Sequence, residues 1–225
     1  MKVQFGFVTA ALLTGFLVTS SGHAAPIDIL VGDKDGFGFA TPCPDVGTCP
    51  GLSNPVIDNR DAAEKAATNG AQITDEYSAV FPGFSPPDAA STADVLFPFA
   101  GKLTSATLSF AAGDFQSDVF GALTANINGI SIPFFYADGR FVTAIHSITL
   151  DAAELTAANL AGVVDLHLDR DSSGDFIAFD WFELAGTTGV PEPASSAVLV
   201  SALVGLGLMR LRRRSRSASN LCASC

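Results

Sequence analysis

The sequence of 225 residues has few of the side chains on which enzymes most often depend. It contains three histidines, and His23, His146 and His167 show no metal-ligand spacing. The chain also lacks a Gly-x-Ser-x-Gly nucleophile elbow, a phosphate-binding loop and a zinc-protease helix. We therefore assign no catalytic and no cofactor-binding residue. A glycosidase remains the alternative, because its two carboxylates can come from distant parts of a chain.

Positive charge is also scarce, with 12 Lys and Arg against 23 Asp and Glu and a net charge of −11. Every acidic residue except Glu192 lies in residues 25–190. The basic residues of that region are Lys34, Arg60, Lys65, Lys102, Arg140 and Arg170. An acidic surface of this kind repels nucleic acid and anionic lipid and attracts cations. We expect no nucleic-acid partner.

Long apolar runs are absent from the middle of the chain and occur only near its two ends. At the beginning, Lys2 precedes an apolar run over residues 3–18, and small residues follow up to Ala25. This order is typical of a secretory signal peptide. Cleavage after Ala24 places Gly22 and Ala24 at the two small positions. The sequence thus predicts a signal peptide over residues 1–24 and an exported domain over residues 25–189.

The second apolar run, residues 194–209, follows the triplet Pro191-Glu192-Pro193. A helix over this run, at about 1.5 Å per residue, measures about 24 Å against about 30 Å of bilayer hydrocarbon. It is a marginal transmembrane helix. An arginine cluster follows and would stay on the cytoplasmic side, which places the preceding domain outside the inner membrane. Its members include Arg210, Arg212, Arg213 and Arg214.

This order of triplet, short apolar helix and arginine cluster over residues 190–216 resembles the PEP-CTERM sorting signal of Gram-negative bacteria that make exopolysaccharide. The resemblance implies transient insertion in the inner membrane and cleavage by an exosortase, followed by delivery to the cell surface or extracellular matrix. Residues 217–225 continue past the arginines, where such signals usually end. The alternative is a permanent tail anchor without processing.

Cysteine usage agrees with export. Cys43 and Cys49 lie in one Pro- and Gly-rich loop, which a local disulfide would close in an oxidising compartment. The alternative is a pair of free or metal-binding thiols. Cys222 and Cys225 belong to the tail extension, and we assign them no redox role.

The middle of the chain consists of short alternating apolar runs separated by turn residues, which predicts strands. The predicted strands cover residues 26–31, 93–99, 103–110, 119–127, 130–136, 141–150, 163–168 and 176–184. Short helices are expected at residues 61–69, where Asp61 and Glu64 form a capping pattern, and at residues 151–159. Because strands and helices do not alternate regularly, we predict an all-β fold, an antiparallel β-sandwich or jelly roll with one or two short helices.

Two Asp-rich turns are candidate calcium ligands, because calcium takes carboxylate and carbonyl oxygens from flexible turns. One follows the first strand and the other precedes the last strand. The candidates are Asp33, Asp35, Asp169, Asp171 and Asp175. Neither turn matches an EF-hand loop, and the alternative is that Asp and Gly are simply good turn residues.

The last predicted strand, residues 176–184, is apolar on both faces, so that Asp180 and Glu183 need partners there. Together with the preceding Gly-Asp turn, it resembles the last strand of carbohydrate-binding jelly rolls. In those modules sugars stack on exposed aromatic rings, which makes Tyr136 and Trp181 candidate ligand residues. The alternative is that both rings fill the core.

Two functional hypotheses follow. The first is a non-catalytic structural or glycan-binding module delivered to the cell surface or to an exopolysaccharide matrix. The second is a secreted glycan-active hydrolase on a jelly-roll scaffold. A pair of carboxylates in an open cleft would favour the second hypothesis.

Overall fold

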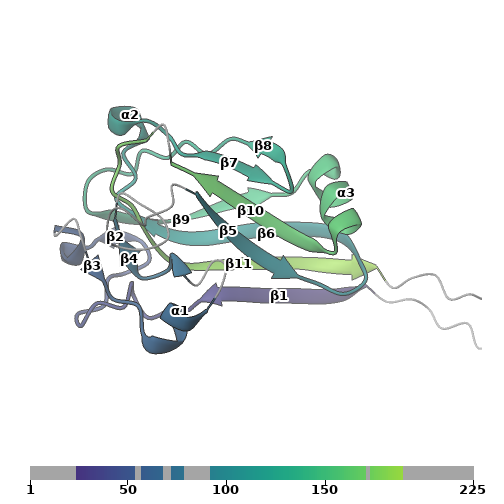
Figure 1. Ribbon diagram of the computed structural model, residues 1–225, viewed down its shortest axis with the longest axis horizontal. Helices are drawn as coiled ribbons and strands as arrows, with labels where there is room; N and C mark the ends of the chain where they lie inside the picture. The colour runs from purple at the N-terminus through teal and green to yellow at the C-terminus, as the bar shows by residue number, and fades with distance from the viewer. Residues whose placement is uncertain (1–23, 54–56, 68–71, 79–91, 171–172, 190–225) are drawn as a thin grey trace, which may run out of the picture. The chain divides into compact units, whose positions relative to one another are not determined.

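Antiparallel strands dominate the computed structural model, which describes residues 24–53, 57–67, 72–78, 92–170 and 173–189 (Figure 1). The described residues belong to a unit that spans residues 23–191. The strands are β1 (Ala25–Gly32), β2 (Gly47–Thr48), β3 (Ile57–Asp58), β4 (Glu76–Tyr77), β5 (Thr92–Pro98), β6 (Lys102–Gly113), β7 (Thr124–Ile127), β8 (Ile130–Ile132), β9 (Val142–Thr149), β10 (Val163–Asp169) and β11 (Ala178–Gly189). The helices are α1 (Ala62–Ala66), α2 (Ser117–Phe120) and α3 (Ala152–Ala161), with a 3-10 turn at Pro50–Ser53.

The strands form two main sheets. The larger has the order β1-β11-β6-β9-β2 and the smaller the order β5-β10-β7-β8, while β3 and β4 pair separately. Every pairing between these strands is antiparallel. The prediction of an all-β antiparallel fold with few short helices is confirmed.

Apolar side chains of both sheets meet in one buried cluster. Phe97 of β5 and Leu166 of β10 come from the smaller sheet, and Phe110 of β6 and Phe182 of β11 from the larger. Along β5 buried residues alternate with partly or fully exposed ones, as expected for a strand with one face toward a core. Burying a Leu or Phe side chain contributes about 1.5–3 kcal/mol, so this shared face is the main source of stability.

Both predicted helices are present. In α3, Asp151 and Glu154 form a capping box, and the helix continues to Gly162, whose φ of 73° ends it in the left-handed region. It packs on β6 and β10, one strand of each sheet. Asp61 and Glu64 form the same capping box on α1, which ends at Ala66, whereas the prediction continued to residue 69. Residues 68–70 lie outside the described part of the chain.

Two predicted strands are shorter than expected. The one at residues 119–127 begins only at Thr124, because Ser117–Phe120 forms α2 and Gly121, with φ of 88°, ends that turn. The one at residues 130–136 ends at Ile132, because Pro133 has no N–H to continue the ladder. An irregular segment therefore follows β8, and its Ala137 forms an isolated bridge with Gln116 in the loop that follows β6.

Several predictions fall on residues that the structure does not describe. They concern the signal peptide up to residue 23, the tail beyond residue 189 and Asp171, whereas Ala24, the predicted cleavage residue, is the first residue described. None of the described helices combines the length and the apolar character that a membrane crossing requires.

Candidate functional site

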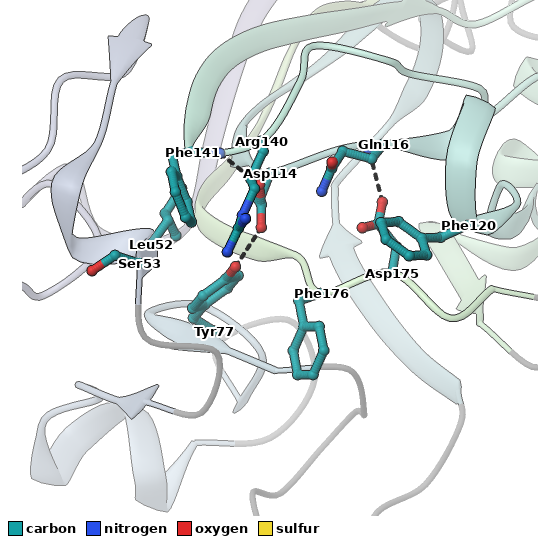
Figure 2. A pocket seen from close by; sticks show the side chains of 10 residues that line it. All are labelled: Leu52, Ser53, Tyr77, Asp114, Gln116, Phe120, Arg140, Phe141, Asp175 and Phe176. Carbon is teal, nitrogen blue, oxygen red and sulfur yellow. Dashed lines mark hydrogen bonds between the residues drawn. The ribbon is translucent and has the colours of Figure 1, made fainter.

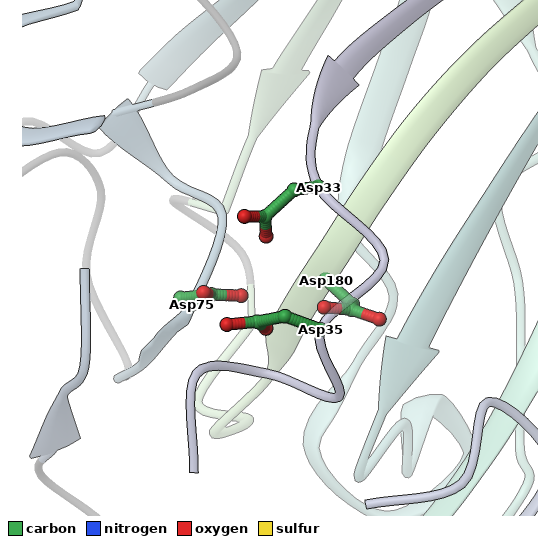
Figure 3. A group of neighbouring side chains, drawn as sticks. All are labelled: Asp33, Asp35, Asp75 and Asp180. Carbon is green, nitrogen blue, oxygen red and sulfur yellow. The ribbon is translucent and has the colours of Figure 1, made fainter. Parts of the chain in front are cut away.

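Three separate segments bring four aspartates together at one end of the larger sheet (Figure 3). β1 ends where Gly32 lies opposite Trp181 of β11, so the loop that follows carries Asp33 and Asp35 toward the start of β11. Thr74 forms a bridge with Phe179. The N–H of the next residue, Asp75, donates to the Phe179 carbonyl at 2.7 Å. Pairing with β11 therefore positions both segments beside Asp180.

A β-bulge directs Asp180 into this group. Phe179 pairs with Ala112 and Trp181 with Ala111 of β6, so Asp180 is the extra residue between them. The bulge lets Phe179 and Phe182 both face the core, which strict alternation would not allow. Asp180 is released from the ladder to face the neighbouring loops.

The four aspartates differ in burial. One carboxylate oxygen from each lies within 4.8 Å of those of the other three. Asp33 and Asp35 are exposed, whereas Asp75 and Asp180 are 2% and 0% exposed. We call these residues the aspartate cluster. It has a solvent side and a buried side.

Few hydrogen bonds compensate the buried carboxylates. The Phe37 N–H donates to Asp180 Oδ1 at 2.8 Å. Asp180 Oδ2 and both oxygens of Asp75 are buried without a hydrogen-bond partner. Within the described residues, no Lys, Arg or His forms an ion pair with any of the four aspartates. Burial, reinforced by neighbouring carboxylates, raises the pKa of Asp75 to about 9. Burial likewise raises the pKa of Asp180 to about 7, although the Phe37 N–H acts in the opposite direction.

The cluster contains part of the predicted calcium set. Asp33 and Asp35 belong to it, but Asp169 ends β10 and Asp175 lines a separate pocket. The two Asp-rich turns do not meet, because Asp175 Oδ2 accepts the Gln116 N–H at 2.7 Å and is held beside the loop after β6. Sequence reasoning missed Asp75 altogether.

A separate pocket of about 390 Å³ is lined by Tyr77 of β4, two residues after Asp75 of the aspartate cluster (Figure 2). Its lining residues combine aromatic rings with polar groups from five stretches of the chain. They are Leu52, Ser53, Tyr77, Asp114, Gln116, Phe120, Arg140, Phe141, Asp175 and Phe176. We call it the aromatic pocket.

Asp114 organises one wall of the aromatic pocket. Its Oδ1 accepts the Phe141 N–H at 2.6 Å, and its Oδ2 accepts the Tyr77 hydroxyl (Figure 2). The Arg140 guanidinium carbon lies 4.3 Å from the centre of the Phe141 ring, a cation–π distance. Burial raises the pKa of Asp114 despite these two donors. The carboxylate thus fixes the positions of two aromatic rings.

Asp175 lies in the same lining and is 1% exposed. Burial raises its pKa to about 6, against the lowering effect of the Gln116 N–H, while Asp114 adds to the rise. Its Oδ1 is buried without a hydrogen-bond partner. Phe120, 46% exposed, and half-buried Phe176 complete the apolar lining.

The aromatic residues predicted as ligand contacts lie elsewhere. Trp181 is 3% exposed, and the Lys34 ammonium group lies 4.3 Å from its ring centre. Lys34 also pairs with Glu183 at 3.1 Å, which supplies the partner expected for that carboxylate. The ring of Tyr136 lies 3.8 Å from that of His146 and packs against the main core. Trp181 is thus nearly inaccessible and Tyr136 is partly buried, and neither ring lines the aromatic pocket; their role in sugar stacking stays a prediction.

A small second core connects the two sites. Cys43 and Cys49 form a disulfide with their Cα atoms 5.1 Å apart, and both cysteines are buried. They pack with Phe37, whose N–H holds Asp180, and with Tyr77 of the aromatic pocket. The disulfide loop therefore supports both the aspartate cluster and the pocket.

Comparisons with known proteins give no family for this chain. No family model and no curated protein matches it. Among solved structures it is similar to the crystal structure of dimeric latent PorU from Porphyromonas gingivalis, with a TM-score of 0.37 and 14% identity. The match covers 76% of this chain and 14% of PorU.

Proposed function

We propose that this protein is an exported, non-catalytic structural or glycan-binding module of the cell surface or the exopolysaccharide matrix. The observation that supports this function best is the aromatic pocket. Small-molecule sites are typically concave and mostly apolar with a few convergent polar groups, which describes this lining.

The chemistry of the pocket suits a sugar unit. The apolar C–H face of a pyranose packs on aromatic rings such as Phe141 and Phe176, while its hydroxyl groups need hydrogen-bond partners around the rim. Arg140 donates only, whereas the Gln116 amide both donates and accepts. Arg140 is exposed and Gln116 partly exposed, so both polar groups are open to solvent and to a ligand.

A hydrolase is the second candidate, because Asp114 and Asp175 line the same pocket and burial raises the pKa of each. The burial of both carboxylates favours binding over catalysis. Asp114 is 2% exposed and both its oxygens already accept hydrogen bonds from the protein. A general acid or base must instead reach the bond that it protonates or deprotonates.

Export and sorting are part of the proposal and depend on the two ends of the chain. The disulfide between Cys43 and Cys49 supports an oxidising compartment. The triplet Pro191-Glu192-Pro193 and the arginines that follow are proposed to direct the chain to an exosortase and then to the surface. In this scheme the inner membrane is a transient partner, and exopolysaccharide is the matrix that the module binds.

A glycan array and calorimetry on the full chain in mild detergent test the proposed function. We expect binding of one class of glycan, lost in Phe141→Ala and reduced in Arg140→Ala. Phe135→Ala is the matched control, because that ring is 60% exposed and does not line the pocket. Binding to no glycan, or binding that Phe141→Ala leaves unchanged, contradicts the proposal. New reducing ends that Asp175→Asn abolishes would establish the hydrolase instead.

A further inference from the structure

We propose that Asp33, Asp35, Asp75 and Asp180 bind one calcium ion, which connects the loop after β1, the segment before β4 and the bulge of β11 (Figure 3). This assignment goes beyond the proposed function and does not depend on it. Its ligand set differs from the one that the two Asp-rich turns predict.

The spacing of the carboxylates fits the size of calcium. Calcium binds oxygen at about 2.3–2.6 Å, so two ligands on opposite sides of the ion are about 4.8 Å apart. The four oxygens all lie within 4.8 Å of one another. These separations are in the range of oxygen–oxygen distances around a single ion, so the four carboxylates are close enough to share one.

The buried side of the cluster gives independent support. Asp75 is only 2% exposed, and neither of its carboxylate oxygens has a hydrogen-bond partner. Asp180 Oδ2 is in the same situation. Burying a carboxylate without a partner is costly, and buried charges in proteins are normally paired or bind metals. A cation at the centre would compensate both residues.

The basic residue nearest in sequence to these aspartates, Lys34, does not supply the positive charge at the centre of the cluster. Lys34 lies between Asp33 and Asp35, but its ammonium group contacts Glu183 and the ring of Trp181. Asp33 and Asp35 are exposed, so an ion can enter from solvent and retain water in its remaining coordination positions.

Close backbone packing supports a defined geometry. A Cβ at Gly38, whose φ is 62°, would lie 2.8 Å from Asp75 Oδ2. The Gly38 N–H donates to Asp35 Oδ1 at 2.7 Å, which orients that carboxylate. Asp75 is two residues before Tyr77, so a bound ion would also stabilise the segment that reaches the aromatic pocket.

Terbium luminescence on the full chain in mild detergent measures the site directly. Trp181, the one tryptophan of the sequence, adjoins Asp180 and can sensitise a terbium ion bound there. We expect emission that saturates at one equivalent and is displaced by calcium at lower concentrations than by magnesium. Calcium should also raise the melting temperature above that in chelator.

Substitutions at the cluster decide the assignment. Asp75→Asn and Asp180→Asn should abolish the emission and the calcium-dependent shift, and the exposed pair Asp33→Asn with Asp35→Asn should weaken binding at least about tenfold. Asp28→Asn, an exposed carboxylate of β1 outside the cluster, should change neither. If Asp75→Asn or Asp180→Asn does not fold, the loss of terbium and calcium binding in the double variant Asp33→Asn with Asp35→Asn tests the assignment. Binding that these variants leave unchanged, or no saturable binding by the wild type, overturns the proposal.

Discussion

Single side chains determine the shape of the aromatic pocket. The Tyr77 hydroxyl donates to Asp114, whose other oxygen accepts the Phe141 N–H, so one buried carboxylate connects two rings that come from distant parts of the chain. Both residues of the Tyr77–Asp114 pair are nearly inaccessible to solvent. Removing one partner of such a pair leaves the other without compensation.

Tyr77→Phe should therefore lower the free energy of unfolding by about 1–3 kcal/mol, because Asp114 Oδ2 would lose its donor in a buried position. Chemical denaturation followed by Trp181 fluorescence measures the change. The second tyrosine provides a matched control, since the Tyr136 hydroxyl makes no hydrogen bond to the described residues. An equal loss in Tyr136→Phe would show that the Tyr77–Asp114 bond contributes nothing specific.

Asp175 should make stability depend on pH. Its pKa is about 6 in the folded protein against 3.8 for the free side chain, so the folded state binds the proton more tightly. The stability from the protonated form is complete below about pH 4 and is lost as the pH rises through about 6. Asp114 and Arg170 influence the same carboxyl group in opposite directions.

Asp175→Asn should be more stable than the wild type at pH 7.5 by about 1–3 kcal/mol and equal to it near pH 4. The Asn side-chain carbonyl can still accept the Gln116 N–H. Urea denaturation in chelator at both pH values tests this, with the exposed Asp28→Asn as control. A difference between the Asp175 variant and the wild type that is the same at both pH values would contradict the pKa assignment.

At the level of secondary-structure elements, helix α3 closes one edge of the two-sheet core. Its capping box satisfies the first free N–H groups: Asp151 Oδ1 accepts from Ala153 and Glu154 at 2.7 and 2.9 Å. In return, Glu154 Oε2 accepts the Asp151 N–H at 2.7 Å. The side chain of Asn159 connects the helix to β6, because it bonds both the N–H and the carbonyl of Leu103.

Asp151→Ala should cost about 0.5–2 kcal/mol of unfolding free energy, because the cap donors lose their acceptor. Asp151→Asn should retain most of the stability, since its carbonyl oxygen still caps the helix. Thermal and urea denaturation compare the two variants with the wild type. If the Ala and Asn variants are equally destabilised, charge rather than capping is the contribution of Asp151.

At the scale of the whole molecule, the large core between the two sheets and the small core around the Cys43–Cys49 disulfide stabilise different parts of the fold. The large core holds the two sheets together, whereas the small one supports Phe37, beside the aspartate cluster, and Tyr77, in the aromatic pocket. Both candidate sites therefore combine residues from the segment between β1 and β5 with residues from later in the chain: Asp180 in the cluster, and Asp114, Phe141 and Asp175 in the pocket.

The chain as a whole should be processed near the triplet Pro191-Glu192-Pro193. We expect mass spectrometry of protein recovered from the cell surface or medium to show a C-terminus close to the triplet. Processing should fail in Glu192→Ala and in cells without the exosortase, whereas Glu183→Ala, in β11, should be processed normally. A recovered protein that extends to Cys225 would refute cleavage.

The sequence alone determined what local patterns control. Alternation located most strands, as at residues 163–168 of β10, and Asp61 and Asp151 marked the starts of both predicted helices, because capping depends on residues three positions apart. The sequence also showed that Asp180 and Glu183 needed partners.

Only the tertiary structure decided which distant residues meet. The bulge at Asp180 leaves no clear pattern in the sequence, and Asp75 lies 42 positions from Asp33, so no local spacing connects them. The sequence did not distinguish Phe141 and Phe176, which line the pocket, from the other phenylalanines, because the side chain is the same whether it fills a core or lines a pocket. Strand pairing and the bulge place these side chains, since both depend on contacts between segments far apart in the chain.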